Sequence, residues 1–230
     1  MNVADHILDF LSKLEIPGRI VPGITVLNPY KHKPALELCE QFFRKYYSDN
    51  GERTLILGIN PGRHGAGLTG IPFTDPVKLE DICGIANDFP KKAELSADFI
   101  YAMIEAYGGP ERFYRNFYFS SVCPLGFVKD GKNLNYYDSK ELQERLRNFI
   151  IKSLHTTLSF GIRTSTCFCL GEGENFKYLN RLNKELHLFG GVIPLAHPRF
   201  IMQYRRKKVD EYITVYLDKL NAAGVDFTHL

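Results

Sequence analysis

The chain has 230 residues, 44% of them hydrophobic, and a formal net charge of +3. This length and apolar content predict a single globular domain over residues 1–230, and the small charge excludes polyanion binding by the field of the whole protein, so a local basic patch is required. The five cysteines, an odd number, argue against a disulfide framework, and because they include no Cys-x-x-Cys pair we expect no metal site and no cofactor such as an iron–sulfur cluster.

Residues 1–15 have an amphipathic helical pattern, with Asp5 and Asp9 and without a basic flank, which is not typical of a signal peptide. No uninterrupted apolar run approaches the ~20 residues needed to span a bilayer. We therefore expect a soluble monomer without membrane contacts, cytoplasmic and nucleoid-associated in a bacterium or nuclear in a eukaryote.

Predicted helices and strands alternate along the chain. The helical patterns cover residues 7–14, 34–47, 77–83, 94–107, 138–158, 175–188 and 204–222. Four short apolar or β-branched runs are predicted strands, at residues 54–59, 116–122, 166–170 and 192–196. Strands separated by helices imply a parallel sheet covered on both faces. The predicted fold class is therefore α/β, a three-layer sandwich with a central four-stranded parallel sheet.

The loop after the first predicted strand is the most specific part of the sequence. Its glycines at positions 58, 62, 65, 67 and 70 let the backbone approach a ligand closely, while Pro61 and Pro72 restrict its path. The loop matches the spacing of a P-loop, but Leu68 stands where a phosphate-binding lysine is needed. It also matches the glycine spacing of a dinucleotide fingerprint, but it continues into Ile71 and Pro72 instead of a helix. Nucleotide cofactor binding is therefore disfavoured.

Polar residues follow three of the four predicted strands. Asn60 comes after the first strand, Ser120, Ser121 and Cys123 lie near the end of the second, and His197 follows the fourth. Because the carboxyl ends of parallel strands meet at one edge of a sheet, we expect these residues to converge on one pocket.

Three of these positions lie in motifs of a known family. The segments Gly58-x-Asn60-Pro61-Gly62 and Thr69-Gly70-x-Pro72-Phe73 resemble the first active-site motif of the uracil-DNA glycosylase superfamily, in particular its single-strand-selective monofunctional (SMUG) branch. His197-Pro198 is similar to the second motif, and its histidine favours this branch over the mismatch-specific one, which has asparagine there. Ser121 replaces the base-reading asparagine of the branch, which points to a bacterial SMUG-like subfamily.

The resemblance implies a monofunctional DNA glycosylase that flips a deaminated base out of DNA and hydrolyses its N-glycosidic bond in base excision repair. Asn60 would hold the attacking water, and His197 would donate a hydrogen bond to the leaving base. Phe73 would stack on the base, and the residues that bind the base would be Gly58, Ile59, Gly62, Phe73 and Ser121. No lysine stands at or beside position 60, so a Schiff-base intermediate is not expected.

The serine at position 121 affects the expected substrate range. An asparagine amide donates and accepts at the same time, whereas the hydroxyl of Ser121 is shorter and rotates to suit its partner. Uracil is the leading substrate, and xanthine or a uracil derivative is the alternative that a looser pocket admits.

A basic run follows His197 and predicts contacts with DNA that contains a deaminated base. Its members are Arg199, Arg205, Arg206, Lys207 and Lys208. A solvated face or a nuclear import signal would explain the same run, but its position beside His197 favours phosphate binding. Arg199, Phe200 and Ile201 are candidates for the wedge that fills the space left by the flipped base.

Two further residues of the glycine-rich loop have ionisable side chains but are not expected in the active site. Asp75 is interpreted as a helix N-cap, and His64 as solvent-exposed or phosphate-facing. Two other functions stay open: a catalytically inactive DNA-binding module of the same fold, and a different α/β hydrolase or nucleotide-processing enzyme. The lack of a P-loop lysine and of a Gly-x-Ser-x-Gly motif speaks against the latter.

Overall fold

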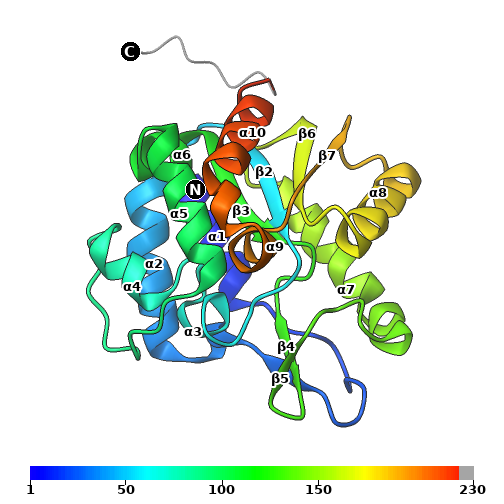
Figure 1. Cartoon of the computed structure of the whole chain (residues 1–230). Helices are drawn as coiled ribbons and strands as arrows, with labels where there is room; N and C mark the ends of the chain where they lie inside the picture. The colour runs from blue at the N-terminus through cyan, green and yellow to red at the C-terminus, as the bar shows by residue number, and fades with distance from the viewer. Residues whose placement is uncertain (223–230) are drawn as a thin grey trace.

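Four parallel strands form the centre of the fold (Figure 1). The computed structural model describes residues 1–222, so the predicted domain range is described only up to Ala222. The strands, in the spatial order β3-β2-β6-β7, are β2 (Arg53–Gly58), β3 (Phe117–Ser121), β6 (Ile162–Leu170) and β7 (Val192–Leu195). The predicted α/β class with a four-stranded parallel sheet is confirmed.

Strand β2 lies in the middle of this sheet and is buried along its whole length. Its apolar residues do not alternate with polar ones because both faces of the strand are covered. The pairing places Gly58 opposite Ser121 on β3 and Leu57 opposite Cys169 on β6. The carboxyl ends of the strands therefore lie together along one side of the sheet, which we call the carboxyl edge.

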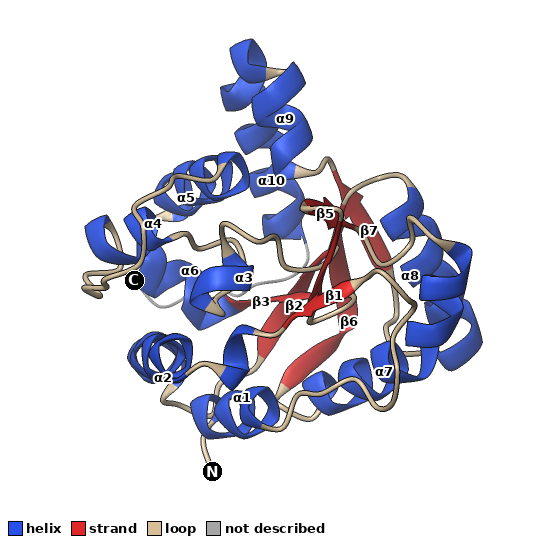
Figure 2. Cartoon of the chain, turned by 90° about the horizontal axis from the view of Figure 1, so that it is seen from below, coloured by secondary structure: helices blue, strands red, loops and turns tan. Residues whose placement is uncertain are grey.

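Helices cover both faces of the sheet (Figure 2). The chain moves toward one side of the sheet from β2 to β3, and toward the other side from β3 to β6 and on to β7. Because such crossovers are right-handed, the helices of the first connection and those of the later two cover opposite faces of the sheet. The helices are α1 (Val3–Ser12), α2 (Lys33–Tyr47), α3 (Ala66–Thr69), α4 (Pro76–Asp81), α5 (Leu95–Tyr107), α6 (Pro110–Asn116), α7 (Lys140–Leu158), α8 (Glu174–Leu186), α9 (Pro198–Tyr204) and α10 (Val209–Ala222). Helix α7 packs on β6, α8 packs on β6 and β7, and α6 packs on β2 and β3.

A small antiparallel sheet was not predicted. It consists of β1 (Thr25–Leu27), β4 (Gly126–Lys129) and β5 (Lys132–Leu134), in the order β1-β4-β5. Strands of three or four residues carry too little periodicity to be recognised. The dipeptide Asp130-Gly131 is nevertheless a sequence signal for a hairpin turn. In the structure both residues have the positive φ that such a turn requires.

Three short helices, α3, α6 and α9, lie where no helix is predicted. Helix α6 begins at Pro110 and α9 at Pro198, and in each the proline occupies the first turn, where its missing N–H is not needed. The predicted helix over residues 204–222 is wrong at its start. Helix α9 ends at Tyr204, a 3-10 turn η2 (Arg206–Lys208) follows, and α10 begins only at Val209. A second 3-10 turn, η1 (Pro29–Lys31), precedes α2.

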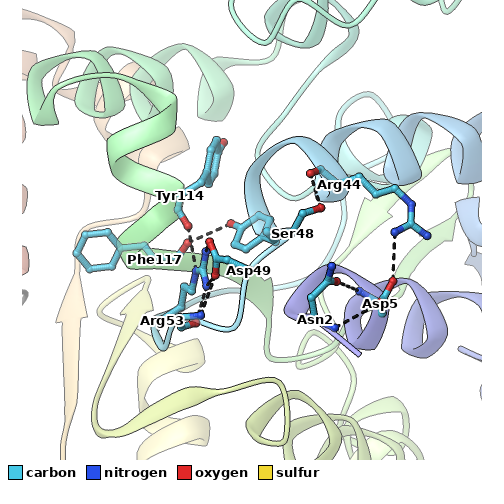
Figure 3. A network of polar contacts seen from close by, with 10 residues as sticks. Asn2, Asp5, Arg44, Ser48, Asp49, Arg53, Tyr114 and Phe117 are labelled. Atoms are coloured by element: carbon cyan, nitrogen blue, oxygen red, sulfur yellow. Dashed lines mark hydrogen bonds and ion pairs between the residues drawn. The ribbon is translucent and has the colours of Figure 1, made fainter.

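The opposite side of the sheet, the amino edge, is held by a buried arginine (Figure 3). Arg53 is fully buried, and its guanidinium donates to the Asp49 carboxylate, with Nη2 2.8 Å from Oδ2, and to the carbonyl oxygen of Tyr114 at 3.3 Å. The Tyr47 hydroxyl donates to the carbonyl oxygen of Phe117 at 3.0 Å. The bonds of Arg53 join the start of β2 to α6 and to the turn after α2, and the bond of Tyr47 joins α2 to the start of β3.

None of the helices within residues 1–222 combines the length and the apolar composition that crossing a bilayer requires.

Candidate active site

A cavity of about 310 Å³ opens at the carboxyl edge of the sheet. It brings together residues from the loop after β2, the end of β3, the turn after β5 and helix α9. The predicted residues that line it are Ile59, Asn60, Gly62, Phe73, Ser121, His197, Arg199 and Phe200. Further lining residues that the sequence did not single out include Glu94, Ser96, Asn133, Asn135, Gln203 and Tyr204.

The side-chain amide of Asn60 has a fixed orientation. Its Nδ2 donates to the carbonyl oxygen of Leu134 at 3.2 Å, and its Oδ1 accepts from the backbone N–H of Tyr136 at 3.0 Å. An amide has two N–H donors and two lone pairs on its oxygen, so one donor and one acceptor remain for a ligand or a water.

Further buried hydrogen bonds support the segment that orients Asn60. The buried Tyr136 hydroxyl bonds Asn175 Oδ1 at 2.9 Å. Asn175 Nδ2 in turn donates to the carbonyl oxygens of Leu170 at 3.0 Å and Gly58 at 3.3 Å. The amide of Asn60 is therefore connected to the ends of β2 and β6 through one buried network.

His197 is the N-cap of α9 and is half-buried at the cavity. Its Nδ1 accepts the backbone N–H of Arg199 at 3.2 Å, so the neutral ring carries its proton on Nε2. Burial, and secondarily the positive charge of Arg199, lower the pKa of His197 from 6.5 to about 4. The imidazole is therefore a neutral hydrogen-bond donor at neutral pH.

Phe73 occupies an unusual backbone conformation beside the cavity. Its φ of 56° is in the left-handed region, which for a bulky residue costs ~1–3 kcal/mol. The ring contacts Phe119, with centroids 5.2 Å apart, and lies over Gly58, where an added Cβ would be 2.6 Å from Cζ. Gly58 does not line the cavity itself, but the absence of a side chain there makes room for the Phe73 ring.

Ser121 ends β3 directly opposite Gly58 and is half-buried at the cavity. Its neighbours Ser120 and Cys123 are buried outside the cavity lining. The predicted convergence on one pocket therefore holds for Asn60, Ser121 and His197, but not for Ser120 and Cys123.

Residues 44–221 match the family described as the uracil DNA glycosylase superfamily. The chain belongs to this superfamily.

Individual members of the superfamily resemble the chain to different extents. The crystal structure of wild-type SMUG2 from Pedobacter heparinus superposes with a TM-score of 0.94 at 46% identity, covering 96% of this chain and 98% of that chain. The single-strand selective monofunctional uracil-DNA glycosylase of Rattus norvegicus is 28% identical over 146 residues, 56% of this chain and 50% of the rat protein. The corresponding protein of Mus musculus is 28% identical over 142 residues, 54% of this chain and 49% of its own length. The chain thus spans about half the length of these two mammalian superfamily members.

Asp75 serves the structure of the superfamily site, as its predicted N-cap role implies. The carboxyl group is buried, and its Oδ1 accepts the backbone N–H groups of Val77 and Lys78 at 3.0 and 2.8 Å. Its Oδ2 accepts the backbone N–H of Glu94 at 2.7 Å. Both oxygens are therefore in use, and Asp75 fixes the point at which Glu94 enters the cavity.

A second cavity, of about 420 Å³, adjoins the first and is bordered by basic residues from several segments. They are Arg63, His64, Lys92, Lys132 and Arg199. None of Arg63, Lys92, Lys132 and Arg199 forms an ion pair with another residue in the range 1–222, whereas many of the other basic residues do. Sequence reasoning missed Arg63, Lys92 and Lys132, because they are isolated in the chain and converge only through the fold.

Helix α9 places the three wedge candidates differently. Arg199 and Phe200 are exposed at the cavity, but Ile201 is fully buried in the core and offers no surface to DNA, so its assignment to the wedge is corrected. Tyr204 is 60% exposed, and its ring lies 5.7 Å from that of Phe200. The exposed aromatic pair at the cavity is therefore Phe200 and Tyr204.

The remaining basic residues lie on the surface next to α9. Arg205, Arg206 and Lys207 are exposed and do not line the cavity, and the Arg205 guanidinium lies 5.3 Å from the centre of the Phe200 ring. Lys208 pairs with Glu211 at 3.1 Å. Within residues 1–222, no three His, Cys, Asp or Glu side chains are grouped as metal ligands would be.

Proposed function

We propose that the chain is a monofunctional DNA glycosylase that hydrolyses the N-glycosidic bond of uracil in DNA. One observation carries this proposal: Asn60 and His197, which follow different strands, line one cavity together with Phe73 and Ser121 in a member of the uracil DNA glycosylase superfamily. The names of the SMUG proteins that the chain resembles support the same activity.

The reaction begins when the target nucleotide leaves the base stack and its base enters the cavity. Phe73 offers an aromatic face to the base, and the free donor and acceptor of Asn60 orient a water molecule below the anomeric carbon. As the glycosidic bond breaks, negative charge develops on the base. The Nε2–H of neutral His197 donates to the oxygen that carries this charge, an interaction worth ~3 kcal/mol in a preorganised site.

The lining of the cavity favours hydrolysis without strand cleavage. Among the described residues that line it there is no lysine, so no amine is placed to form a Schiff base with the sugar. The product is then an abasic site in an intact strand.

The base specificity follows from Ser121. A hydroxyl group matches the edge of uracil less strictly than an amide, so we propose uracil as the main substrate and xanthine or a uracil derivative as additional ones.

DNA binding is assigned to the basic border of the second cavity, together with Arg199 and the exposed residues Arg205, Arg206 and Lys207. Cations without acidic partners attract phosphates most effectively, and release of counterions then makes binding depend on salt. Phe200 and Tyr204 are placed to fill the gap that the flipped base leaves.

The test is base release from labelled oligonucleotides that carry one uracil, hydroxymethyluracil, hypoxanthine or xanthine, detected by alkaline cleavage, with wild type and Asn60→Ala. We expect release from uracil by the wild type and a loss of at least ~100-fold in the variant, because the water loses its position. Salt-sensitive binding without release from any lesion would instead identify an inactive binding module.

A further inference from the structure

Glu94 is an acidic residue of the cavity that the reaction described above does not use. It stands at the N-cap position of α5, yet its side chain makes no capping bond to that helix. The carboxyl group lies instead against the glycine-rich loop. An added Cβ at Gly65 would be 1.9 Å from Glu94 Oε2, and one at Gly62 would be 3.1 Å from Oε1. Because Gly62 and Gly65 have no side chains, they leave space for the Glu94 carboxyl group beside the loop that follows Asn60.

The surroundings of this carboxyl group leave it available. The structure gives the side chain of Glu94 no hydrogen bond from any residue within 1–222, although the residue is half-buried. The titratable and charged groups that face it from the neighbouring elements are Asp75, Arg63, His64, Lys92, Lys132, His197 and Arg199. Burial, and then the charge of Asp75, raise the pKa of Glu94 to about 7 in spite of Arg199.

A proton acceptor beside the attacking water accelerates hydrolysis. A water molecule that attacks the anomeric carbon must lose a proton, and the Asn60 amide cannot accept one. The Asp75 carboxylate is committed to three backbone N–H groups, and His197 is needed as a donor. Glu94 is the remaining side chain of the cavity that binds a proton reversibly near neutral pH.

We propose that Glu94 is the general base that deprotonates the water held by Asn60. The oxygen of the water forms a bond to the anomeric carbon while its proton passes to the Glu94 carboxylate. The carbon–nitrogen bond breaks, and its electron pair leaves with the base, whose oxygen accepts the hydrogen bond of His197. The departed base then takes up a proton from solvent while Glu94 releases its proton to solvent, so the carboxylate is restored and the net change is addition of one water across the glycosidic bond. This assignment rests on the proposed glycosylase activity.

The experiment compares single-turnover rates of uracil release by wild type, Glu94→Gln and Glu105→Gln over a pH series on both sides of neutrality. Glu105 is an exposed carboxylate on the same helix and serves as the matched control. We expect the wild-type and Glu105→Gln rates to rise with pH through about 7, the pKa of Glu94. Glu94→Gln should lose ~100-fold or more at the plateau and show a flat profile, because a general base typically contributes 10²–10⁴-fold.

A chemical rescue separates a missing base from a damaged fold. Formate added to Glu94→Ala should restore part of the rate, since a small carboxylate fits the space left by the side chain. A Glu94→Gln rate that equals the wild-type rate, or that falls but keeps the wild-type pH profile, would overturn the assignment while leaving the glycosylase intact. Failure of the wild type to release any base would instead overturn the proposed function.

Discussion

The two edges of the central sheet use their polar groups in opposite ways. At the amino edge Arg53 is fully buried, and each of its three guanidinium nitrogens donates to a fixed acceptor. At the carboxyl edge Asn60 and His197 are half-buried, and each keeps a donor that no residue within 1–222 occupies. The amino edge is therefore built for stability, and the carboxyl edge leaves hydrogen-bonding capacity for a ligand.

This difference implies that substitutions at the two edges should separate activity from stability. Among the substitutions that compare the two edges, His197→Ala has the largest expected effect on activity. Removal of one preorganised donor to a developing negative charge lowers the rate by ~10²–10³-fold. The variant also loses the N-cap of α9, so the free energy of unfolding should fall by only ~1 kcal/mol. Single-turnover uracil release measures the rate, and thermal unfolding measures the stability. A variant that is strongly destabilised but normally active would contradict the assignment of activity to the carboxyl edge and stability to the amino edge.

Arg53→Met reverses this pattern. The substitution leaves the buried carbonyl oxygen of Tyr114 without this donor and removes the ion pair to Asp49, whose side chain is exposed. We expect the free energy of unfolding to fall by ~1–3 kcal/mol, the ordinary cost of one unsatisfied buried acceptor. The rate per folded molecule should stay at the wild-type value. Denaturant unfolding measures the loss, with the exposed Arg19→Met as the matched control. A drop in rate without a drop in stability would show that the two edges are coupled.

Gly58→Ala tests the place where the sheet supports the site directly. The new Cβ would be 2.6 Å from Phe73 Cζ, so the ring must move, at a cost of ~1–3 kcal/mol for overpacking. We expect weaker substrate binding and a higher KM, because the displaced ring narrows the cavity. The double variant Gly58→Ala/Phe73→Leu should be more stable than Gly58→Ala alone, because the smaller side chain leaves room for the new Cβ. If the losses of unfolding free energy of the two single variants simply add in the double variant, positions 58 and 73 are not in contact.

The sequence predicted the parts of this molecule that depend on local order in the chain. The four strands followed from apolar runs, and Asn60, Ser121 and His197 converged because parallel strands end at one edge. Glu94 was missed, because an acidic residue at a predicted helix start is an ordinary N-terminal residue unless its side chain is known to turn away from the helix. Ile201 was misplaced, because only the unpredicted start of α9 at Pro198 shows that its side chain faces the core.

The smallest expected effect concerns the stability of the carboxyl edge itself. The pKa of Glu94 is raised from 4.5 to about 7, so the folded protein holds this proton more tightly than the unfolded chain does. The contribution of Glu94 to stability is therefore fully present below 4.5 and is lost as the pH rises through about 7. Glu94→Gln cannot ionise, so its Tm should exceed that of wild type by on the order of a few degrees above neutral pH and should match it in acid. Thermal unfolding of both proteins across this range, with Glu105→Gln as control, measures the difference. If Glu94→Gln is more stable than wild type but releases uracil more slowly, the site retains this carboxylate at the expense of stability. Equal Tm values of the two proteins at every pH would instead mean that the Glu94 carboxylate is well solvated.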